Sequence, residues 1–191
     1  MKNSNKLIVI TGTSGVGKTT LVEYLLSCLE LNLAFSISAC SRKKRDTERN
    51  GTNYIFLSKS DFKKKIEQDC FIEWEEVYPG QFYGTLKESI DNMFQLGKNI
   101  LFDIDVKGAM SIKETFQQQV STIFIKPPTI IEAQKRLINR QTESEKSLKK
   151  RIKKMESELK FAKNMDVQLV NDDLEITKKR LYTHVKSFLI K

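Results

Sequence analysis

Residues 12–19 read GTSGVGKT and match the pattern GxxxxGK[ST], a combination of residue types suited to holding phosphate. Glycines let consecutive backbone N–H groups converge on phosphate oxygens, and the start of a helix adds partial positive charge. Lys18 can reach the β- and γ-phosphates of a nucleotide, and the Thr19 hydroxyl can face Mg²⁺. We therefore predict nucleotide phosphate binding by Gly12, Thr13, Ser14, Gly15, Val16, Gly17, Lys18, Thr19 and Thr20.

The elements on either side of this loop suit that chemistry. Leu7 to Ile10 form a short apolar run rich in β-branched residues, which predicts a buried parallel strand. Apolar residues then repeat at three- and four-residue spacing from Lys18 to about Leu31, which predicts a helix. The alternative is a chance glycine turn, but a flanking strand and helix favour the phosphate-binding interpretation.

The rest of the chain indicates an α/β fold with a parallel sheet covered on both faces. We expect further buried strands at Asn99–Ile104, Ser121–Ile125 and Val167–Val170, and a last helix from about Asp173 to Leu189. Strands that alternate with helices imply right-handed crossovers and a doubly wound sheet. Asp103 ends one strand, where a carboxylate can orient Mg²⁺; capping of the next turn is the alternative role.

Two segments do not fit this alternation. The first covers residues 36–87, where we expect strands at Asn53–Leu57 and Phe71–Val77 around a polar helix at Ser60–Glu67. The second runs from Thr129 to about Lys163 and reads as helical. Its capping boxes pair Thr129 with Glu132 and Thr142 with Glu145, and its apolar stripe contains Leu148, Ile152, Met155, Leu159 and Ala162.

The arginines gather in these two segments. The chain has 33 basic residues, of which only seven are arginine, and Arg42, Arg45, Arg136, Arg140 and Arg151 lie in two short stretches. A guanidinium group can bind phosphate through two parallel hydrogen bonds, which a lysine cannot do. Both segments are therefore candidates for phosphate recognition, although a solvated helix face is the alternative for each arginine.

The order of the motifs resembles the guanylate kinase family. After the phosphate loop, residues 36–42 read SISACSR and are followed by Arg45, Glu48, Gly51 and the YIF of residues 54–56. The resemblance continues through FIEW at 71–74, FYGT at 82–85, DID at 103–105 with Gly108, Arg136-Leu137 with Arg140, Arg151-Ile152 and VNDD at 170–173. These collinear matches cover nearly the whole chain.

The resemblance implies one domain over residues 1–191 with a P-loop NTPase-like α/β core at 1–35, 88–126 and 164–191. It implies that residues 36–87 are an inserted mixed α/β region that binds GMP, and that 127–163 are a helical lid over ATP. The implied reaction transfers the γ-phosphoryl group of ATP to GMP and gives ADP and GDP. Mg²⁺ would be held by Thr19 and Asp103, partly through water.

The resemblance assigns the GMP site to Ser38, Arg42, Arg45, Tyr54, Glu73, Tyr83, Thr85 and Asp105. Guanine presents N1–H and its N2 amino group side by side, and one carboxylate, Glu73, can accept both. Ser38 and Thr85 can donate to O6. Adenine has an acceptor at N1 and would leave the buried carboxylate unpaired, so such a site rejects it by ~10⁴-fold or more. The arginines and tyrosines would hold the GMP phosphate.

On the donor side, the resemblance adds Arg136 and Arg140 as ATP-phosphate contacts and Asn171 as an adenine contact. The implied catalytic residues are Lys18, Arg42, Arg140 and Arg151. No side-chain base is needed, because the second pKa of a phosphate monoester is about 6 and GMP attacks as a dianion. Catalysis then depends on position and charge, and we expect His184 to pack or lie at the surface and Trp74 to belong to the core.

Composition and sequence pattern narrow the possible partners, the cellular location and the roles of the cysteines. The net charge of +9 reflects a general lysine bias without a nucleic-acid motif, so we expect no nucleic-acid partner. The apolar runs are strand-sized and no signal peptide is recognisable, so we expect a cytoplasmic protein without a membrane segment. Cys28, Cys40 and Cys70 are spaced as plain thiols. A monomer and a homodimer remain open, as does the use of dGMP.

Some residues depart from the family pattern, and some alternative functions stay open. Lys44, Asp46, Thr47, Lys107 and Gln141 are unusual at their positions, and the Tyr78-Pro79-Gly80 stretch is lengthened. The alternatives are a kinase for AMP, UMP or TMP, a non-catalytic peptide-binding module, and a GTP-hydrolysing switch. The combination of Glu73, Ser38 and Thr85 weighs against the first, an intact Lys18 and Thr19 against the second, and a missing NKxD motif against the third.

Overall fold

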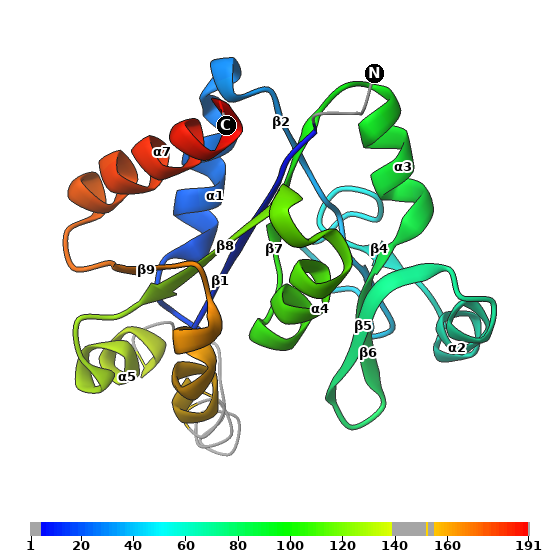
Figure 1. Ribbon diagram of the computed structural model, residues 1–191. Coiled ribbons are helices and arrows are strands. Elements are labelled where there is room, and N and C mark those ends of the chain that lie inside the picture. The colour runs from blue at the N-terminus through cyan, green and yellow to red at the C-terminus, as the bar shows by residue number, and fades with distance from the viewer. Residues whose placement is uncertain (1–4, 139–151, 153–154, 191) are drawn as a thin grey trace.

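Figure 1 shows the computed structural model, which describes residues 5–138, 152 and 155–190. In chain order its elements are β1 (Leu7–Gly12), α1 (Lys18–Ser27), η1 (Leu29–Leu31), β2 (Leu33–Phe35), β3 (Ala39–Cys40), β4 (Ile55–Phe56), α2 (Lys59–Glu67), β5 (Phe71–Tyr78), β6 (Gln81–Leu86), α3 (Lys87–Gln95), β7 (Asn99–Asp103), α4 (Val106–Phe116), η2 (Gln117–Gln119), β8 (Val120–Lys126), α5 (Ile130–Ile138), η3 (Ala162–Asn164), β9 (Val167–Val170) and α7 (Leu174–Ile190). Residues 155–161 are also helical.

A five-stranded sheet forms the centre of the molecule. Its strand order is β2-β7-β1-β8-β9, and each pair of neighbours is parallel. One face packs against α1 and α7, and the other against α3, α4 and Ala162 (Figure 1). Both faces of β1 are therefore buried, which explains why its sequence is apolar at every position from Leu7 to Ile10. The doubly wound α/β expectation is confirmed.

A second sheet lies beside the first and is built from the inserted segment. Its order is β4-β3-β6-β5, with β3 and β4 parallel and the other two pairs antiparallel. A small core of its own joins α2 to this sheet, because Phe62 stacks on Phe71 with ring centroids 4.5 Å apart. The mixed α/β character expected of residues 36–87 is therefore present.

Several element bounds differ from expectation. The first helix ends at Ser27, and a 3₁₀ turn continues to Leu31 before Asn32, at φ 48°, turns the chain into β2. The strand expected at Asn53–Leu57 is reduced to Ile55 and Phe56, preceded by a single bridge between Asn50 and Tyr54. Trp74 is 44 % exposed rather than part of the core, because strand alternation turns Glu73 inward and Trp74 outward.

The described part of residues 127–163, the segment expected to form a lid, follows the sequence pattern. The Glu132 N–H donates to Thr129 Oγ1 at 3.1 Å just before α5, as a capping residue should. In the helical stretch at 155–161, Met155 is fully buried against Ala133 of α5, and Leu159 packs on both this pair and the main core. The Thr142–Glu145 box and Leu148 lie outside the described residues.

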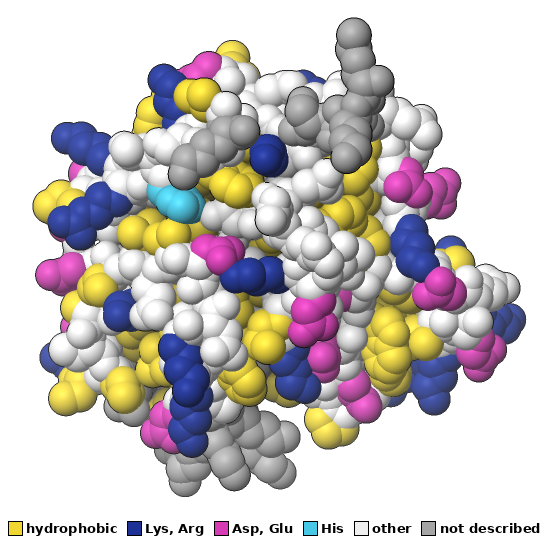
Figure 2. All heavy atoms as spheres, in the orientation of Figure 1, with side chains coloured by type: hydrophobic (Ala, Val, Ile, Leu, Met, Phe, Trp, Pro, Cys, Tyr) yellow, Lys and Arg dark blue, Asp and Glu magenta, His cyan; other side chains and the backbone are white. Residues whose placement is uncertain are grey.

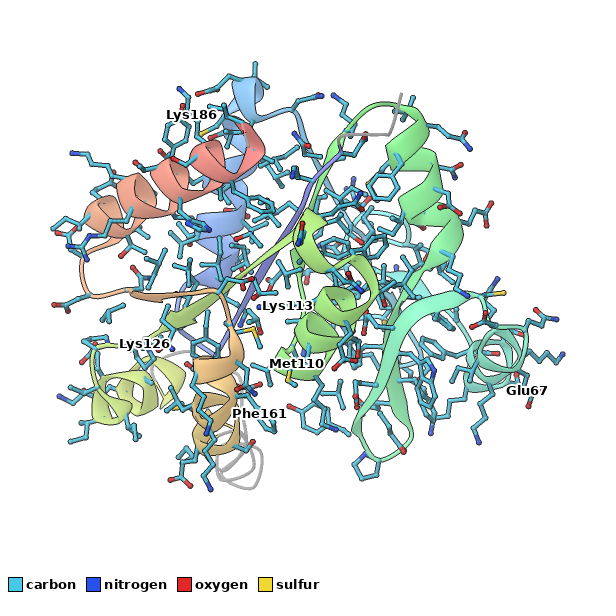
Figure 3. The ribbon with its side chains drawn as sticks, in the orientation of Figure 1. Glu67, Met110, Lys113, Lys126, Phe161 and Lys186 are labelled. Atoms are coloured by element: carbon cyan, nitrogen blue, oxygen red, sulfur yellow. The ribbon has the colours of Figure 1, made fainter. Side chains whose placement is uncertain are left out.

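Charged side chains of both signs are interspersed over the face shown in Figure 2. Lys113, labelled in Figure 3, pairs with Asp166 and so ties α4 to the loop before β9. His184 of α7 lies 2.8 Å from Ser121 Oγ of β8, which fits the packing role expected for it. None of the helices in the described ranges is both long and apolar enough to span a bilayer.

Candidate active site

The phosphate loop leaves the carboxyl end of β1, at the centre of the parallel sheet. Gly12 has φ +148°, and a Cβ atom at this position would lie 2.1 Å from the Ile125 carbonyl oxygen of β8. Only glycine therefore lets the chain turn there. Lys18 Nζ donates to the carbonyl oxygens of Gly12 at 2.8 Å and Thr13 at 3.4 Å, so its ammonium group lies across the loop.

Asn171 supports this loop from behind. Its Nδ2 donates to the Val16 carbonyl oxygen at 2.8 Å, and the residue is only 5 % exposed. A Cβ atom on Gly17 would approach the same nitrogen to 2.7 Å. The sequence led us to expect an adenine contact from Asn171, but in this geometry its amide nitrogen is directed at the protein backbone.

Two aspartates, one at the end of β7 and one just after it, have different surroundings. Asp103 pairs in register with Ile10 of β1, next to the phosphate loop. Burial raises the pKa of its carboxyl group, and the nearby Lys18 ammonium partly lowers it again. Asp105 caps α4 by accepting hydrogen bonds from the backbone N–H groups of Lys107 at 3.1 Å and Gly108 at 3.0 Å.

Glu73 is a buried carboxylate on β5, only 8 % exposed. It accepts a hydrogen bond from the Thr85 hydroxyl at 2.6 Å, and Gly108 is so close that a Cβ there would lie 2.9 Å from Glu73 Oε2. Burial raises the pKa of Glu73 to about 7, with hydrogen bonds from Thr85 lowering it and the charges of Asp105 and Glu75 raising it. The Thr85 proton is directed at Glu73, so in this geometry Thr85 does not serve guanine O6 as we expected.

Arg42 lies behind the tyrosines of the second sheet. Its guanidinium group contacts Glu48 through Nη1 and Nη2, each at 2.6 Å, and donates from Nε to the Tyr83 hydroxyl at 3.1 Å. Its centre is 4.9 Å from the Tyr54 ring centroid. The hydrogen bonds from Arg42 hold the pKa of Glu48 at about 2, well below its usual range.

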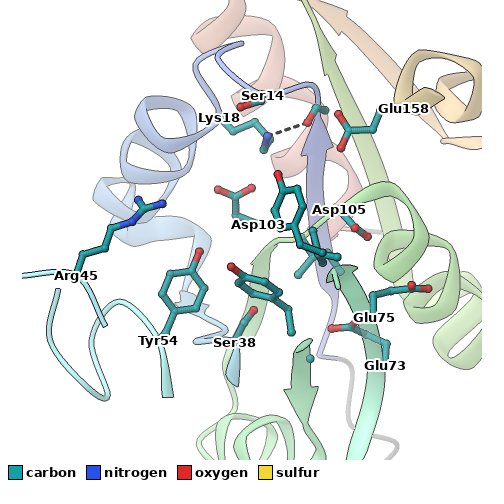
Figure 4. Close-up of a pocket in the computed structure, with 16 residues that line it drawn as sticks. Ser14, Lys18, Ser38, Arg45, Tyr54, Glu73, Glu75, Asp103, Asp105 and Glu158 are labelled. Carbon is teal, nitrogen blue, oxygen red and sulfur yellow. Dashed lines mark hydrogen bonds between the residues drawn. The ribbon is translucent and has the colours of Figure 1, made fainter. Parts of the chain in front are cut away.

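One cavity of about 330 Å³ joins these groups (Figure 4). Its donor side contains Gly12, Ser14, Lys18 and Asp103, and its other side contains Ser38, Arg45, Tyr54, Glu73, Tyr83 and Asp105. The structure thus brings Gly12, Ser14 and Lys18 of the phosphate loop together with six of the eight residues predicted for GMP and with Asp103. Arg42 and Thr85 do not line the cavity but bond to Tyr83 and Glu73 respectively, while Thr19 and Thr20 are exposed at the start of α1.

Six of the residues that line the cavity had not been predicted as site residues: Glu75, Val77, Tyr78, Gly84, Ile104 and Glu158. Glu75 also pairs with Lys107 of α4 at 3.2 Å. Glu158 belongs to the lid helix and enters the cavity near the phosphate loop (Figure 4). The alternating pattern of β5 was a signal for Glu75 and Val77, whereas Glu158 looked like one of many charges on a solvated helix.

The predicted lid arginines cannot be placed. Arg140 and Arg151 lie outside the described residues, and for Arg136 the structure describes the backbone of α5 only. Their roles stay predictions. Among the described residues there is no group of three acidic, histidine or cysteine side chains that could hold a metal ion without help from a ligand.

The model of the family described as guanylate kinase matches residues 4–189 of this chain. The chain belongs to the guanylate kinase family. A guanylate kinase from Porphyromonas gingivalis is 44 % identical over 186 residues, 97 % of this chain and 99 % of the relative. One from Chlorobaculum tepidum is 41 % identical over 187 residues, 98 % of this chain and 95 % of the relative.

A solved structure of the same family shares the fold. The crystal structure of guanylate kinase from Anaplasma phagocytophilum aligns with a TM-score of 0.77 at 26 % identity. The alignment covers all of this chain and 89 % of that one. The guanylate kinase family therefore accounts for both sheets, including the mixed one that the inserted segment forms.

Proposed function

We propose that this protein transfers the γ-phosphoryl group of ATP to GMP, with the residues of the shared cavity in the roles set out below. The observation that carries the proposal is the cavity itself, where a phosphate-binding loop and a buried carboxylate with neighbouring hydroxyls face one space. Two nucleotides bound there would meet with their phosphates between Lys18 and Arg45.

Guanine recognition centres on Glu73. As a carboxylate it accepts N1–H and the N2 amino group together, while Thr85 fixes one of its oxygens from behind. Ser38 lines the same cavity and is the remaining donor for O6. A base with an acceptor at N1 would leave Glu73 without a partner in a buried site, which is a large penalty.

The acceptor phosphate is held by Arg45, Tyr54 and Tyr83, which line the cavity. Arg42 contributes through Tyr83, because its Nε–H orients the tyrosine hydroxyl, and Glu48 holds the guanidinium group in place. A charged donor beside the hydroxyl also makes that hydroxyl a better hydrogen-bond donor to an anion.

On the donor side, backbone N–H groups of the loop and Lys18 would bind the ATP phosphates. In this structure the Lys18 ammonium group bonds to Gly12 and Thr13 carbonyl oxygens, and it would exchange these for phosphate oxygens. Arg136, Arg140 and Arg151 remain proposed lid contacts that neutralise charge on the transferring group.

The chemistry of two side chains fits a magnesium ion. Asp103 offers a carboxylate beside the loop, and Thr19 offers a hydroxyl at the start of α1. Mg²⁺ prefers oxygen ligands and is usually completed by substrate phosphates and water. When bound, the ion would neutralise charge that develops on the transferring phosphoryl group.

The test is a coupled assay of ADP release with ATP and each of GMP, dGMP, AMP, UMP and TMP. We expect turnover with the guanine nucleotides alone, a higher KM for GMP in Glu73→Gln, and near-complete loss of turnover in Lys18→Ala. Glu67→Gln, on the exposed face of α2 (Figure 3), is the matched carboxylate control and should behave as the unmodified protein. Comparable turnover with AMP or UMP, or an active Lys18→Ala variant, would refute the proposal.

A further inference from the structure

The β5–β6 hairpin forms one wall of the cavity, and regular strand alternation explains most of its residues. Glu73, Glu75 and Val77 occupy every second position of β5 and line the cavity. Trp74 and Glu76 lie between them and are exposed. With a period of two, the next residue, Tyr78, should also point away from the cavity.

Tyr78 lines the cavity nevertheless, directly after Val77. The pairing of the strands shows why. Glu76 pairs with Phe82, but Tyr78 pairs with Gln81, so two residues of β5 lie opposite one residue of β6. Such a β-bulge reverses the alternation beyond it, and bulges beside active sites often redirect a side chain in this way.

The turn after the bulge keeps this arrangement in place. Gly80 adopts φ +73°, which strongly favours glycine, and its N–H donates to Glu76 Oε1 at 2.5 Å. From its sequence we expected this stretch to be longer than the family pattern, and the bulge lies beside it.

Tyr78 shares the cavity with the donor loop and with the acceptor tyrosines. Lys18 and Ser14 line it on one side, and Tyr54 and Tyr83 on the other. Burial is the main reason why the pKa of Tyr83 is raised, and Tyr78 adds a smaller contribution in the same direction, so the two hydroxyls are close enough to interact. Tyr78 is half-buried, which leaves room for its hydroxyl to meet a bound nucleotide.

We propose that Tyr78 is a third tyrosine of the phosphate site, redirected by the β-bulge so that its hydroxyl donates a hydrogen bond to the phosphoryl group in transit between the nucleotides. This rests on the proposed function. In this role Tyr78 supplies a hydrogen bond and acts neither as an acid nor as a base. A donor placed where charge develops stabilises the transition state more than either bound substrate.

The test is Tyr78→Phe, which removes only the hydroxyl. We expect kcat to fall about tenfold, with KM for ATP and GMP within about twofold, because the bond strengthens in the transition state. Tyr83→Phe is the contrast: its hydroxyl contacts the ground-state GMP phosphate, so KM for GMP should rise instead. Tyr182→Phe, on α7 and bonded to Glu30 at 2.8 Å, is the tyrosine control and should change neither constant.

A Tyr78→Leu variant separates the ring from the hydroxyl. If Tyr78→Phe matches the unmodified protein while Tyr78→Leu is impaired, the ring only shapes the cavity and the proposal is overturned. A rise in KM for GMP without loss of kcat would overturn it too. An unmodified protein that releases no ADP with GMP would refute the proposed function and this inference together, whereas an active protein with a fully active Tyr78→Phe variant would refute only the inference.

Discussion

At the scale of single residues, the surroundings of Glu73 disfavour the ionised form of its carboxyl group. Burial, with smaller contributions from the charges of Asp105 and Glu75, raises the pKa of its carboxyl group to about 7, although hydrogen bonds from Thr85 act in the opposite direction. Recognition of guanine needs the ionised form, because a protonated carboxyl group cannot accept two donors. Near neutral pH, part of the free enzyme is therefore in the wrong protonation state for GMP.

This predicts a pH-dependent affinity for GMP. With a pKa of about 7, the ionised fraction of Glu73 falls about tenfold between pH 8 and pH 6, and the affinity should fall by the same factor. Calorimetric titration with GMP at the two pH values measures the change. The GMP phosphate titrates near pH 6 as well, so Glu73→Gln is the reference: it should retain only that weaker dependence. Equal pH dependence in both proteins would contradict the assignment.

The residue types at the site could be predicted where the chemistry of a ligand requires one kind of side chain. A loop of glycines with Lys18, and a carboxylate for guanine, follow from the needs of the ligands. The supporting pairs were not predictable, because Glu48 under Arg42 and Thr85 on Glu73 join residues through side-chain geometry that no spacing in the chain encodes. Tyr78 was not predicted as a site residue for a related reason. A β-bulge interrupts the two-residue alternation of side chains from which the orientation of strand residues is predicted.

At the scale of elements, long buried strands were predictable and short ones were not. β1, β7 and β8 are apolar because helices cover both faces of the sheet, so their sequences alone identify them. β3 has only two residues and β2 only three, so neither is long enough for its apolar residues to identify a strand. Their pairing depends on the rest of the sheet.

The loop between β9 and α7 gives an element-scale prediction. Asn171 holds the Val16 carbonyl oxygen, so Asn171→Ala would leave a buried acceptor unpaired and cost about 1–3 kcal/mol in the free energy of unfolding. Because the phosphate loop loses its support, we expect KM for ATP to rise and KM for GMP to stay unchanged. Urea unfolding and steady-state kinetics measure the two effects.

Asn92→Ala, on the exposed face of α3, is the matched control for Asn171→Ala and should alter neither quantity. A rise in KM for GMP alone would contradict the support role and place Asn171 in the acceptor site. An Asn171→Asp variant adds a stricter comparison. It keeps the shape of the side chain but removes the amide N–H, so it should impair ATP binding at least as much.

At the scale of the whole molecule, the site lies between two separately packed bodies. The parallel sheet and the mixed sheet each have their own core, and the cavity is lined by both. Water must leave this space before phosphoryl transfer, or ATP would be hydrolysed instead. We therefore expect the mixed sheet and the lid to close over bound nucleotides.

Small-angle scattering tests this closure. A bisubstrate inhibitor that spans both halves of the cavity should reduce the radius of gyration, and ATP or GMP alone should reduce it less. An unchanged radius with the inhibitor bound would contradict closure. The packing of Met155 on Ala133 implies that α5 and the helical stretch at 155–161 move as one body during this step.

The hydrogen bonds of Lys18 have one more consequence. Its ammonium group bonds to the carbonyl oxygens of two consecutive loop residues, so the side chain proposed to bind the ATP phosphates also holds the loop in shape. Truncation of Lys18 removes the phosphate contact and the hydrogen bonds to the loop together. The activity lost by a Lys18→Ala variant will therefore exceed the contribution of the phosphate contact alone. Distortion of the loop will account for the excess.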